Sequence, residues 1–171
     1  KSMKWGDHNL FWGRPLKSIL CVFDGKKMDF NFGHLKSSNT TFVDKELEEK
    51  TKSFSNFKSY NSFFKSLGIL IDQEKRKSFI SNELIKLSNK KKLKINLKEN
   101  LLEEITNIVE KPKILLCKFD KKYLMIPKEI LIITMQNHQK YFPTFDNKEN
   151  LTNNFFVVAD TKDPKGFVKL G

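Results

Sequence analysis

The first third of the chain alternates apolar and polar positions in short runs that are typical of β-strands. The runs 19–24 and 27–32 flank Asp24-Gly25, a pair that favours a two-residue hairpin turn. From 33 to 52 the alternation loses its period, and this interval is expected to be a long polar connection. The pattern therefore predicts an antiparallel hairpin followed by a loop.

A helical period replaces this pattern between residues 56 and 67, where aromatic side chains recur every three or four positions. Gly68 follows this stripe and is expected to end the helix. Core packing is favoured over a base-stacking platform for these rings. The stripe consists of Phe57, Tyr60, Phe63 and Phe64.

Two further helical stripes follow a short apolar run at 69–71, which is expected to be a strand. Asp72 is the expected N-cap of the first helix, and Asn96 with Glu99 forms a capping-box-like pair before the second. Residues 88–96 form a lysine-rich link that is expected to be mobile. The side chains predicted to be buried are Phe79, Ile80, Leu84 and Leu87 in the first helix, and Leu97, Leu101, Leu102, Ile105, Ile108 and Val109 in the second, which Pro112 ends.

The last third returns to strand-like runs around one short helix. The intervals 113–119 and 123–126 are predicted to pair around Asp120-Lys121, and 141–145 and 155–159 are predicted to complete the sheet. Strands thus come in hairpin-like pairs and helices come in blocks. This order predicts an α+β fold with a mostly antiparallel sheet and packed helices.

The most distinctive segment is the run Met-Gln-Asn-His-Gln-Lys-Tyr-Phe-Pro at 135–143, which follows an apolar helix predicted over 129–135. Amides, an imidazole and an ammonium group are costly in a core, so the helix is expected to deliver them to a surface before Pro143. Tyr141 and Phe142 should point to opposite sides of the following strand. At most one of these two rings is therefore expected to face a partner.

Length and composition bound the class of protein. With 171 residues, 39% of them hydrophobic, the chain has the size and apolar content of one domain spanning 1–171. Its apolar runs are far shorter than a membrane span, so no membrane partner is expected. Cys21 and Cys117 lie in apolar runs and are expected to be buried thiols of a reducing compartment. A cytoplasmic location is the expectation that follows.

The formal net charge of +12 suits a polyanionic partner, because lysine and arginine near phosphates release bound counterions. Only Arg14 and Arg76 among the 32 basic residues are arginine, and the single alanine is Ala159. An A/T-rich genome produces the same bias through its codons. Charge alone therefore does not decide between RNA contact and compositional bias.

Candidate catalytic and metal-binding groups are few. The histidines His8, His34 and His138 are scattered, and the 7 glycines form no phosphate-binding loop, so no metal site or bound cofactor is expected in this chain. Glu103 and Glu104 point about 100° apart on a helix, and one or both are expected to be solvated. His138 is a candidate general base, but no Ser, Cys or Asp partner is identifiable, which favours a structural histidine.

The 135–143 run is one of several segments that occur in the order of a known family. The others are Lys1–Gly6 with Phe11, Arg14 and Pro15, Asn39–Thr41, Ile71–Lys77, Leu101–Glu110 with Pro112, and Phe119–Glu129. Together they resemble the β subunit of bacterial heterotetrameric glycyl-tRNA synthetase, whose motif MxNHQKYFP is similar to 135–143. The family's Arg-Gly-His-Arg-Phe run after Asn-Thr-Thr is replaced here by Phe42-Val43-Asp44-Lys45-Glu46, so roles of that basic cluster are not transferred.

The resemblance implies that the chain is an internal region of a larger β subunit, with a fold similar to the editing module of the phenylalanyl-tRNA synthetase β chain. It also implies a place in glycine–tRNA ligase, which makes glycyl-tRNA from ATP, glycine and tRNA-Gly. In the family, ATP with Mg²⁺ is used by the separate α subunit. The implied partners are the α subunit, the remaining β domains and tRNA-Gly.

On this resemblance the chain is expected to support tRNA binding and subunit architecture without catalytic residues of its own. The residues expected to contact RNA or a neighbouring domain are Lys4, Arg14, Asn137, His138, Gln139 and Lys140. The cations are expected to meet phosphates, and the amides to bond to ribose, bases or a neighbouring domain. A buried ion pair is the alternative role for Arg14. A scaffold without RNA contact and an editing hydrolase using His138 are the alternative functions.

Overall fold

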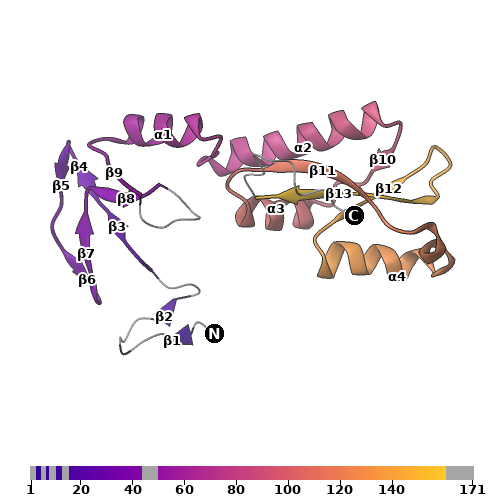
Figure 1. Cartoon of the computed structure of the whole chain (residues 1–171), viewed down its shortest axis with the longest axis horizontal. Coiled ribbons are helices and arrows are strands. Elements are labelled where there is room, and N and C mark those ends of the chain that lie inside the picture. The colour runs from indigo at the N-terminus through magenta and orange to yellow at the C-terminus, as the bar shows by residue number, and fades with distance from the viewer. Residues whose placement is uncertain (1–2, 5–6, 8–10, 13–15, 44–49, 161–171) are drawn as a thin grey trace. The chain divides into compact units, whose positions relative to one another are not determined.

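The computed structural model describes residues 3–4, 7, 11–12, 16–43 and 50–160 of the chain. The chain folds into two compact units, an N-terminal unit over Lys1–Ser66 and a C-terminal unit over Leu67–Gly171. Figure 1 shows the first in indigo to magenta and the second in pink to yellow. Each unit has its own set of elements, and the single domain expected over 1–171 stays a prediction.

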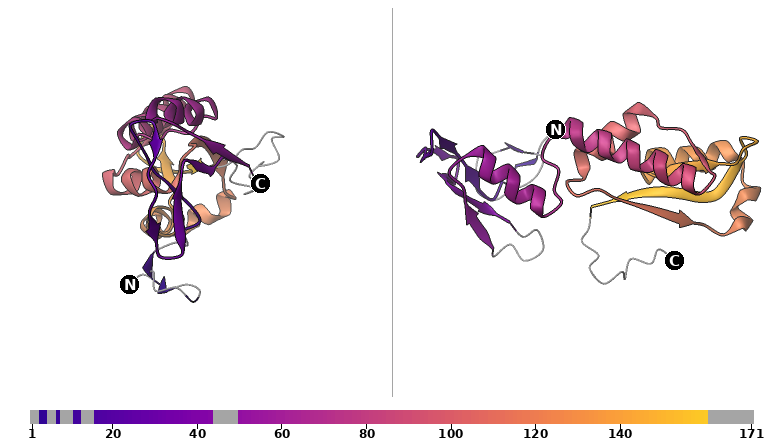
Figure 2. Two further views of the ribbon diagram at one scale, coloured as in Figure 1. Left: turned by 90° about the vertical axis from the view of Figure 1, so that its left-hand side faces the viewer. Right: turned by 90° about the horizontal axis from the view of Figure 1, so that it is seen from above.

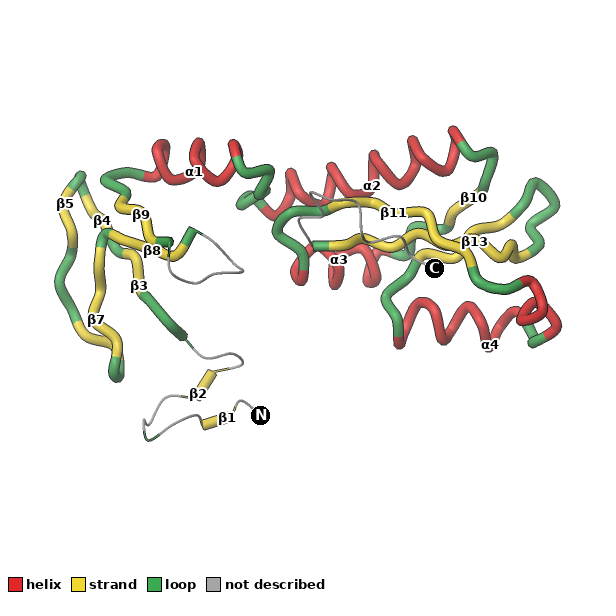
Figure 3. The backbone as a smooth tube through the Cα atoms, viewed as in Figure 1, coloured by secondary structure: helices red, strands yellow, loops and turns green. Residues whose placement is uncertain are grey.

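The N-terminal unit is built from short strands (Figure 3). The predicted hairpin is confirmed, with Asp24 at φ 46° and Gly25 at φ 74° between two antiparallel strands. Positive φ at both central positions is what a type I′ turn requires. The strands are β1 (Met3–Lys4), β2 (Phe11–Trp12), β3 (Ile19–Leu20), β4 (Val22–Phe23), β5 (Lys26–Lys27), β6 (Asn31–Phe32), β7 (Leu35–Ser38), β8 (Thr40–Phe42) and β9 (Thr51–Ser53).

The long polar connection expected over 33–52 is wrong where the structure describes it, because β7, β8 and β9 lie there. The buried Ser37 shows why the apolar alternation is missing. Its hydroxyl accepts a hydrogen bond from the backbone N–H of Phe30 at 2.8 Å and donates one to the carbonyl of Met28 at 2.6 Å. The buried side chain at this position of β7 is thus held by hydrogen bonds to the backbone, where an alternating pattern would place an apolar residue.

The predicted aromatic helix is confirmed as α1 (Phe57–Ser66). Its first turn is capped by Asn56, whose Oδ1 accepts a hydrogen bond from the backbone N–H of Ser59 at 2.8 Å. Gly68, with φ at 78°, lies just beyond its C-terminus. Local polar and glycine chemistry therefore sets both ends of the helix.

The rings of α1 pack around Phe54, which precedes the helix and is itself buried. The centroids of Phe54 and Tyr60 are 5.1 Å apart in an edge-to-face arrangement. Phe64 is buried as predicted, whereas Phe57 is 71% exposed and the core prediction for it is wrong. The stripe is a small aromatic cluster with one ring left at the surface.

The C-terminal unit has a four-stranded antiparallel sheet in the order β10-β12-β13-β11. Figure 2 shows α2 lying along this sheet when the molecule is seen from above. The elements are α2 (Gln73–Lys90), β10 (Lys94–Ile95), α3 (Glu99–Ile108), β11 (Lys113–Lys118), a 3₁₀ helix (Lys121–Met125), α4 (Lys128–Ile133), β12 (Phe142–Phe145) and β13 (Leu151–Ala159). The prediction of an α+β fold with mostly antiparallel strands is confirmed.

One apolar core joins α2 and α3 to the sheet. Ile80 and Leu84 of α2, Phe142 of β12 and Phe156 of β13 are fully buried at its centre. Leu101, Leu102, Ile105 and Val109 complete the cluster. Phe79 and Ile108 were also predicted to be buried, which is wrong, because they are 42% and 50% exposed.

Two predictions around α2 have opposite outcomes. The N-cap is confirmed, since Asp72 Oδ1 accepts a hydrogen bond from the Lys75 N–H at 3.1 Å. The strand over 69–71 is wrong, and that segment is held in place by Arg76. Its guanidinium donates to the Leu70 carbonyl and, at 2.8 Å, to the Thr106 carbonyl. Arg76 therefore fastens the start of α2 to α3.

The capping-box prediction for α3 is wrong, because its N-cap is Lys98 and makes no side-chain capping bond. The lysine-rich interval 88–96 is mostly regular structure, since it contains the end of α2, the buried Ser88 and β10. Its mobility stays a prediction.

The strand predicted over 123–126 is also wrong. Asp120 Oδ1 accepts a hydrogen bond from the Lys122 N–H at 2.9 Å and starts the 3₁₀ helix Lys121–Met125 instead. The strand β11 pairs instead with β13, from Lys113 opposite Ala159 to Lys118 opposite Asn154. No helix in the described part of the chain is long and apolar enough to cross a membrane.

Candidate functional site

The polar run singled out from the sequence begins with a turn of π-helix. Thr134–His138 continues α4 in this wider form, and the Gln139 N–H donates to the Thr134 carbonyl at 3.1 Å. The Tyr141 N–H then donates to the Met135 carbonyl at 2.8 Å. A π-turn inserts an extra residue into a helix and often lies at a functional site. We call residues 134–140 the π-turn segment.

The π-turn segment divides its side chains between the inside and the surface. Met135 and Gln136 are buried, whereas Asn137, His138 and Gln139 are exposed. The prediction that this helix delivers polar groups to a surface is therefore confirmed for three consecutive residues. None of these three side chains makes a hydrogen bond or ion pair within the described chain.

Lys140 ends the segment in the left-handed conformation, with φ at 59°. For a residue with a side chain this conformation is uncommon and has to be held by its surroundings. Lys140 Nζ lies 2.8 Å from Glu104 Oε2 of α3, and the Lys140 side chain is 34% exposed. Glu103 and Glu104 are both exposed, as expected, and this ion pair ties the segment to α3.

The strand that follows anchors the other end of the segment. Phe142 is fully buried in the core, and Tyr141, only partly exposed, stacks on Phe155 with the ring centroids 4.8 Å apart. The predicted alternation of these two rings is confirmed. The exposed polar residues thus project from a turn that is fixed by α3 on one side and by β12 on the other.

A pocket of about 450 Å³ lies between the π-turn segment and the first turn of α3. Its lining residues are Lys98, Glu99, Asn100, Leu101, Glu104, Gln136, Asn137 and Lys140. Each of the two carboxylates in this lining forms an ion pair with a lysine. Glu99 pairs with Lys77, and Glu104 pairs with Lys140. The hydrogen bond with Glu99 raises the pKa of Lys77 above its ordinary value. Lys98 has no ion pair in the described chain.

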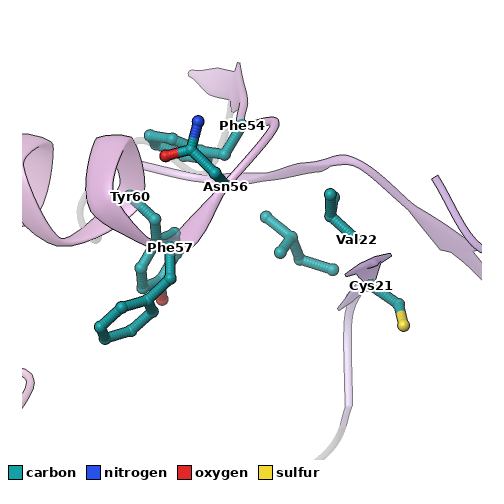
Figure 4. A pocket seen from close by; sticks show the side chains of 7 residues that line it. Cys21, Val22, Phe54, Asn56, Phe57 and Tyr60 are labelled. Carbon is teal, nitrogen blue, oxygen red and sulfur yellow. The ribbon is translucent and has the colours of Figure 1, made fainter. Parts of the chain in front are cut away.

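A second pocket, of about 380 Å³, lies within the N-terminal unit beside α1. Figure 4 shows Phe57 and Tyr60 on one side of it, with the Cys21 sulfur turned away from these rings. The Asn56 side chain at its edge is already used to cap α1. Cys21 is half-buried and Cys117 is buried, and both thiols are free. This pocket is therefore mainly apolar and lacks converging polar groups.

The structure places the remaining predicted contact residues as follows. Lys4 is exposed on β1 of the N-terminal unit, and Arg14 lies outside the described residues. The described residues include no group of three or more His, Cys, Asp or Glu side chains that could hold a metal ion. The structure thus brings together four of the six predicted contact residues, all in the π-turn segment.

Comparison with known proteins decides the family. A family profile described as "Glycyl-tRNA synthetase beta subunit" matches residues 1–171. The chain belongs to the glycyl-tRNA synthetase β subunit family. It is 38% identical over 160 residues to the glycine–tRNA ligase β subunits of Rickettsia akari and Rickettsia canadensis, and 36% identical over 162 residues to that of Rickettsia felis. Each match covers 94% of this chain and 24% of the relative, so the chain spans about a quarter of these relatives' length.

Sequence reasoning missed three residues of this member of the glycyl-tRNA synthetase β subunit family. Gln136 belongs to the polar run, and the sequence did not show that it is buried while its neighbours are exposed. Its burial is seen only in the π-helical turn. Lys98 and Glu104 lie about 40 residues away in sequence and reach the segment through the packing of α3. One sequence signal for Glu104 was available. The helical spacing of α3 places Leu101 and Ile105 in the core, and it places Glu104 at the edge of that buried stripe.

Proposed function

We propose that this chain contributes tRNA-contacting residues to a glycine–tRNA ligase β subunit, chiefly those of the π-turn segment. The observation that carries the proposal is the group Asn137, His138 and Gln139, which is exposed on a turn anchored at both ends. Amide and imidazole groups fixed in this way can bond to ribose or base edges, while lysines meet phosphates. Lys4, Lys140 and Arg14 are the proposed phosphate contacts.

The whole enzyme is proposed to make glycyl-tRNA from glycine, ATP and tRNA-Gly together with an α subunit. No residue of this chain is assigned to ATP or to its Mg²⁺. The proposed partners are therefore the α subunit, the other β domains and tRNA-Gly. The proposed role of this chain is to position RNA and to hold domains together.

Fluorescence anisotropy with labelled tRNA-Gly over a salt series tests this proposal. The triple variant Asn137→Ala, His138→Ala, Gln139→Ala is expected to weaken binding by about tenfold at every salt concentration. Lys140→Gln should reduce the slope of log affinity against log salt by about one, because one phosphate contact is lost. Equal affinity of wild type and both variants for tRNA would overturn the proposal.

A matched control separates a lost RNA contact from a lost ion pair. Lys86 is an ion-paired lysine outside the π-turn segment, since it is exposed on α2 and its Nζ lies 2.9 Å from Glu83 Oε1 of the same helix. Lys86→Gln is expected to leave both the affinity and the salt slope unchanged. If Lys86→Gln lowers the slope as much as Lys140→Gln does, the net charge and not the π-turn segment carries RNA binding.

A domain-packing role is the second candidate, and exposed apolar residues favour it. Met125 is 90% exposed, and Ile130 and Ile133 of α4 are 56% and 53% exposed. The chain spans about a quarter of its relatives' length, so the proposed cover for these residues is the rest of the β subunit. Peroxide oxidation of Met125 should be slower in the full subunit than in this chain, with the buried Met135 as an internal reference. Equal Met125 oxidation rates in the two proteins would contradict this packing.

Hydrolytic editing has the weakest support. His138 is exposed and makes no hydrogen bond within the described chain, so no neighbouring group orients it as a general base. We expect mischarged tRNA-Gly to survive incubation with high concentrations of this chain. Release of amino acid that His138→Ala abolishes would establish editing instead.

A further inference from the structure

The strand β11 lies at one edge of the C-terminal sheet. Among the described residues, its only strand neighbour is β13. The right-hand view of Figure 2 shows β11 along the outer side of this sheet. Its six residues, Lys113–Lys118, equal the length of an average strand. The edge is therefore long enough to pair with one more strand.

The hydrogen bonds at the end of β11 show which of its backbone groups are free. The Phe119 N–H donates to the Asn153 carbonyl at 3.0 Å, so the odd-numbered residues of β11 direct their backbone groups toward β13. Pro143 of β12 agrees with this phase, because it lies opposite Phe155 on the other side of β13, where the ladder needs no N–H donor. The even-numbered residues of β11 thus direct their backbone groups away from the sheet.

These outward-pointing residues are Ile114, Leu116 and Lys118. No described residue forms a hydrogen bond with their N–H or C=O groups. Free N–H and C=O groups at every second residue match the backbone of a further β-strand. A helix offers no such row, because its backbone groups bond within the helix. The geometry therefore selects an extended segment as the partner of this edge.

The side chains of β11 indicate what this segment carries. The four central residues are apolar, and each is at least partly buried. Ile114 and Leu116 pack against the core of the sheet. Lys113 and Lys118, at the two ends, are exposed, and neither forms an ion pair with any described residue. The edge thus offers an apolar centre between two free positive charges.

Lysines on an edge strand also serve to oppose pairing in native proteins. Here Lys113 and Lys118 occupy only the ends, and the residues between them carry no charge, so the centre of the edge is left unprotected. The two ends can instead select a partner, because a carboxylate opposite a lysine forms a favourable cross-strand pair. The lysines are five residues apart, so matching carboxylates lie five residues apart and on opposite faces of the partner strand.

We propose that β11 pairs with an extended segment of the β subunit that lies outside this chain, in which two carboxylates five residues apart flank apolar residues. The chain spans about a quarter of its relatives' length, so the rest of such a subunit can supply this strand. A segment of the same polypeptide also loses less translational freedom on pairing than a separate molecule does. The added strand runs antiparallel to β11, as every other pair in this sheet does.

This proposal does not rest on tRNA contact, because β11 contains no residue of the π-turn segment. It rests on the domain-packing candidate for the presence of further β-subunit segments. It adds to that candidate a contact of defined geometry, apart from Met125 and α4.

Hydrogen exchange at single-amide resolution tests the pairing, with β11 as its own reference. In this chain, the amides of Ile114, Leu116 and Lys118 should exchange about 100-fold faster than those of Leu115 and Cys117, which bond to β13. In the complete β subunit, the added strand should slow the first set to rates similar to those of the second. Outward-pointing amides that exchange equally fast in both proteins would overturn the proposal.

Charge reversal tests the chemistry of the added strand in the complete subunit. The double variant Lys113→Glu, Lys118→Glu places like charges opposite each other and should speed exchange of the Leu116 amide by about tenfold. The matched control is Lys58→Glu, Lys65→Glu, at two exposed lysines of α1, which should leave that rate unchanged. An equally slow Leu116 amide in wild type and the Lys113→Glu, Lys118→Glu variant would show a strand without the carboxylates and would overturn the proposal.

The isolated chain shows whether these substitutions damage β11 itself. The Leu115 amide bonds to β13 and should stay slow in Lys113→Glu, Lys118→Glu. If it exchanges faster, the milder variant Lys113→Gln, Lys118→Gln replaces it, and the expected acceleration at Leu116 in the complete subunit is about threefold. No acceleration in that variant would overturn the carboxylate pairing.

Other occupants of the edge give different results in the same measurement. Protection of the outward-pointing amides that rises with the concentration of this chain would assign the edge to a second copy. Protection that appears only when an α subunit is added would assign it to a separate protein. Either result would overturn the proposal.

The outcomes also separate this proposal from those above. If no strand pairs with β11, the tRNA contacts of the π-turn segment still stand or fall by the anisotropy assay. Slow outward-pointing amides together with equal Met125 oxidation rates would support the added strand and reject the packing over α4.

Discussion

The N-terminal unit buries two apolar side chains in its described part, Phe54 and Phe64, whereas the C-terminal unit gathers eight into one core. The first holds strands of two to four residues by side-chain hydrogen bonds such as those of Ser37, and the second has the nine-residue strand β13 at the centre of its sheet. A contact residue is positioned only as well as the element that carries it. The difference therefore gives the π-turn segment a firmer support than Lys4 has on its two-residue strand.

The largest expected effect comes from removing the centre of the C-terminal core. Phe156 is fully buried, and Phe156→Ala should lower the free energy of unfolding by about 3–5 kcal/mol. Phe79→Ala is the matched control, because Phe79 is 42% exposed, and should cost less than about 1 kcal/mol. Urea denaturation of both variants measures the two values. Similar losses in both would contradict the assignment of the core.

A smaller loss is expected where a charged side chain links α2 to α3. Arg76→Met keeps the length of the side chain but leaves the carbonyls of Leu70 and Thr106 without their donor. This change should lower the free energy of unfolding by about 2 kcal/mol. Lys75→Met serves as the control, since the Lys75 side chain is 79% exposed. Equal urea midpoints for the two variants would show that Arg76 does not hold α2.

The hydrogen-bonded character of the N-terminal unit is tested at Ser37. Ser37→Ala removes the acceptor for the Phe30 N–H and the donor for the Met28 carbonyl, and should cost about 1–2 kcal/mol of local stability. Faster hydrogen exchange of the Phe30 amide is the expected measurement. Ser55→Ala, at an exposed position, should leave that exchange rate unchanged. Unaltered exchange in both variants would mean that apolar contacts hold this unit as well.

The smallest effect is a pH dependence at the start of α2. The Lys75 N–H holds the pKa of Asp72 below its ordinary value of 3.8, because its hydrogen bond favours the carboxylate. The native pKa lies below that of the unfolded chain, so this stabilisation is present above pH 3.8 and is lost as pH falls through the native pKa. Asp72→Asn keeps a capping oxygen but cannot titrate. Its urea midpoint should therefore fall less than that of wild type below about pH 4. If the urea midpoints of wild type and Asp72→Asn fall in parallel as the pH is lowered, Asp72 does not contribute to acid unfolding.

Features with local causes could be predicted from the sequence. Asp24-Gly25 sets its own turn, Gly68 ends α1, and Asp72 caps α2, each through a bond or conformation within a few residues. Within the run at 135–143, Asn137, His138 and Gln139 were correctly expected at a surface. These predictions needed no knowledge of distant partners.

Features that depend on distant partners could not be predicted. The apolar run 123–126 has the composition of a strand, but Asp120 starts a 3₁₀ helix and β11 finds its partner in β13, more than 30 residues later. Gln136 looked like its exposed neighbours because the inward rotation comes from one extra residue in the turn. The family was evident from the ordered motifs, whereas the pocket required the packing of α3.

The central place of β13 has a consequence for the order in which the chain acquires structure during synthesis. The strand β11 leaves the ribosome first, yet its only strand neighbour in the described sheet is β13. Until Ala159 has been added and released, the run Ile114-Leu115-Leu116 presents an unpaired edge to solvent or to a chaperone. The sheet that supports the π-turn segment can therefore close only after β13 has emerged, and this stretch of nascent chain stays unpaired until then.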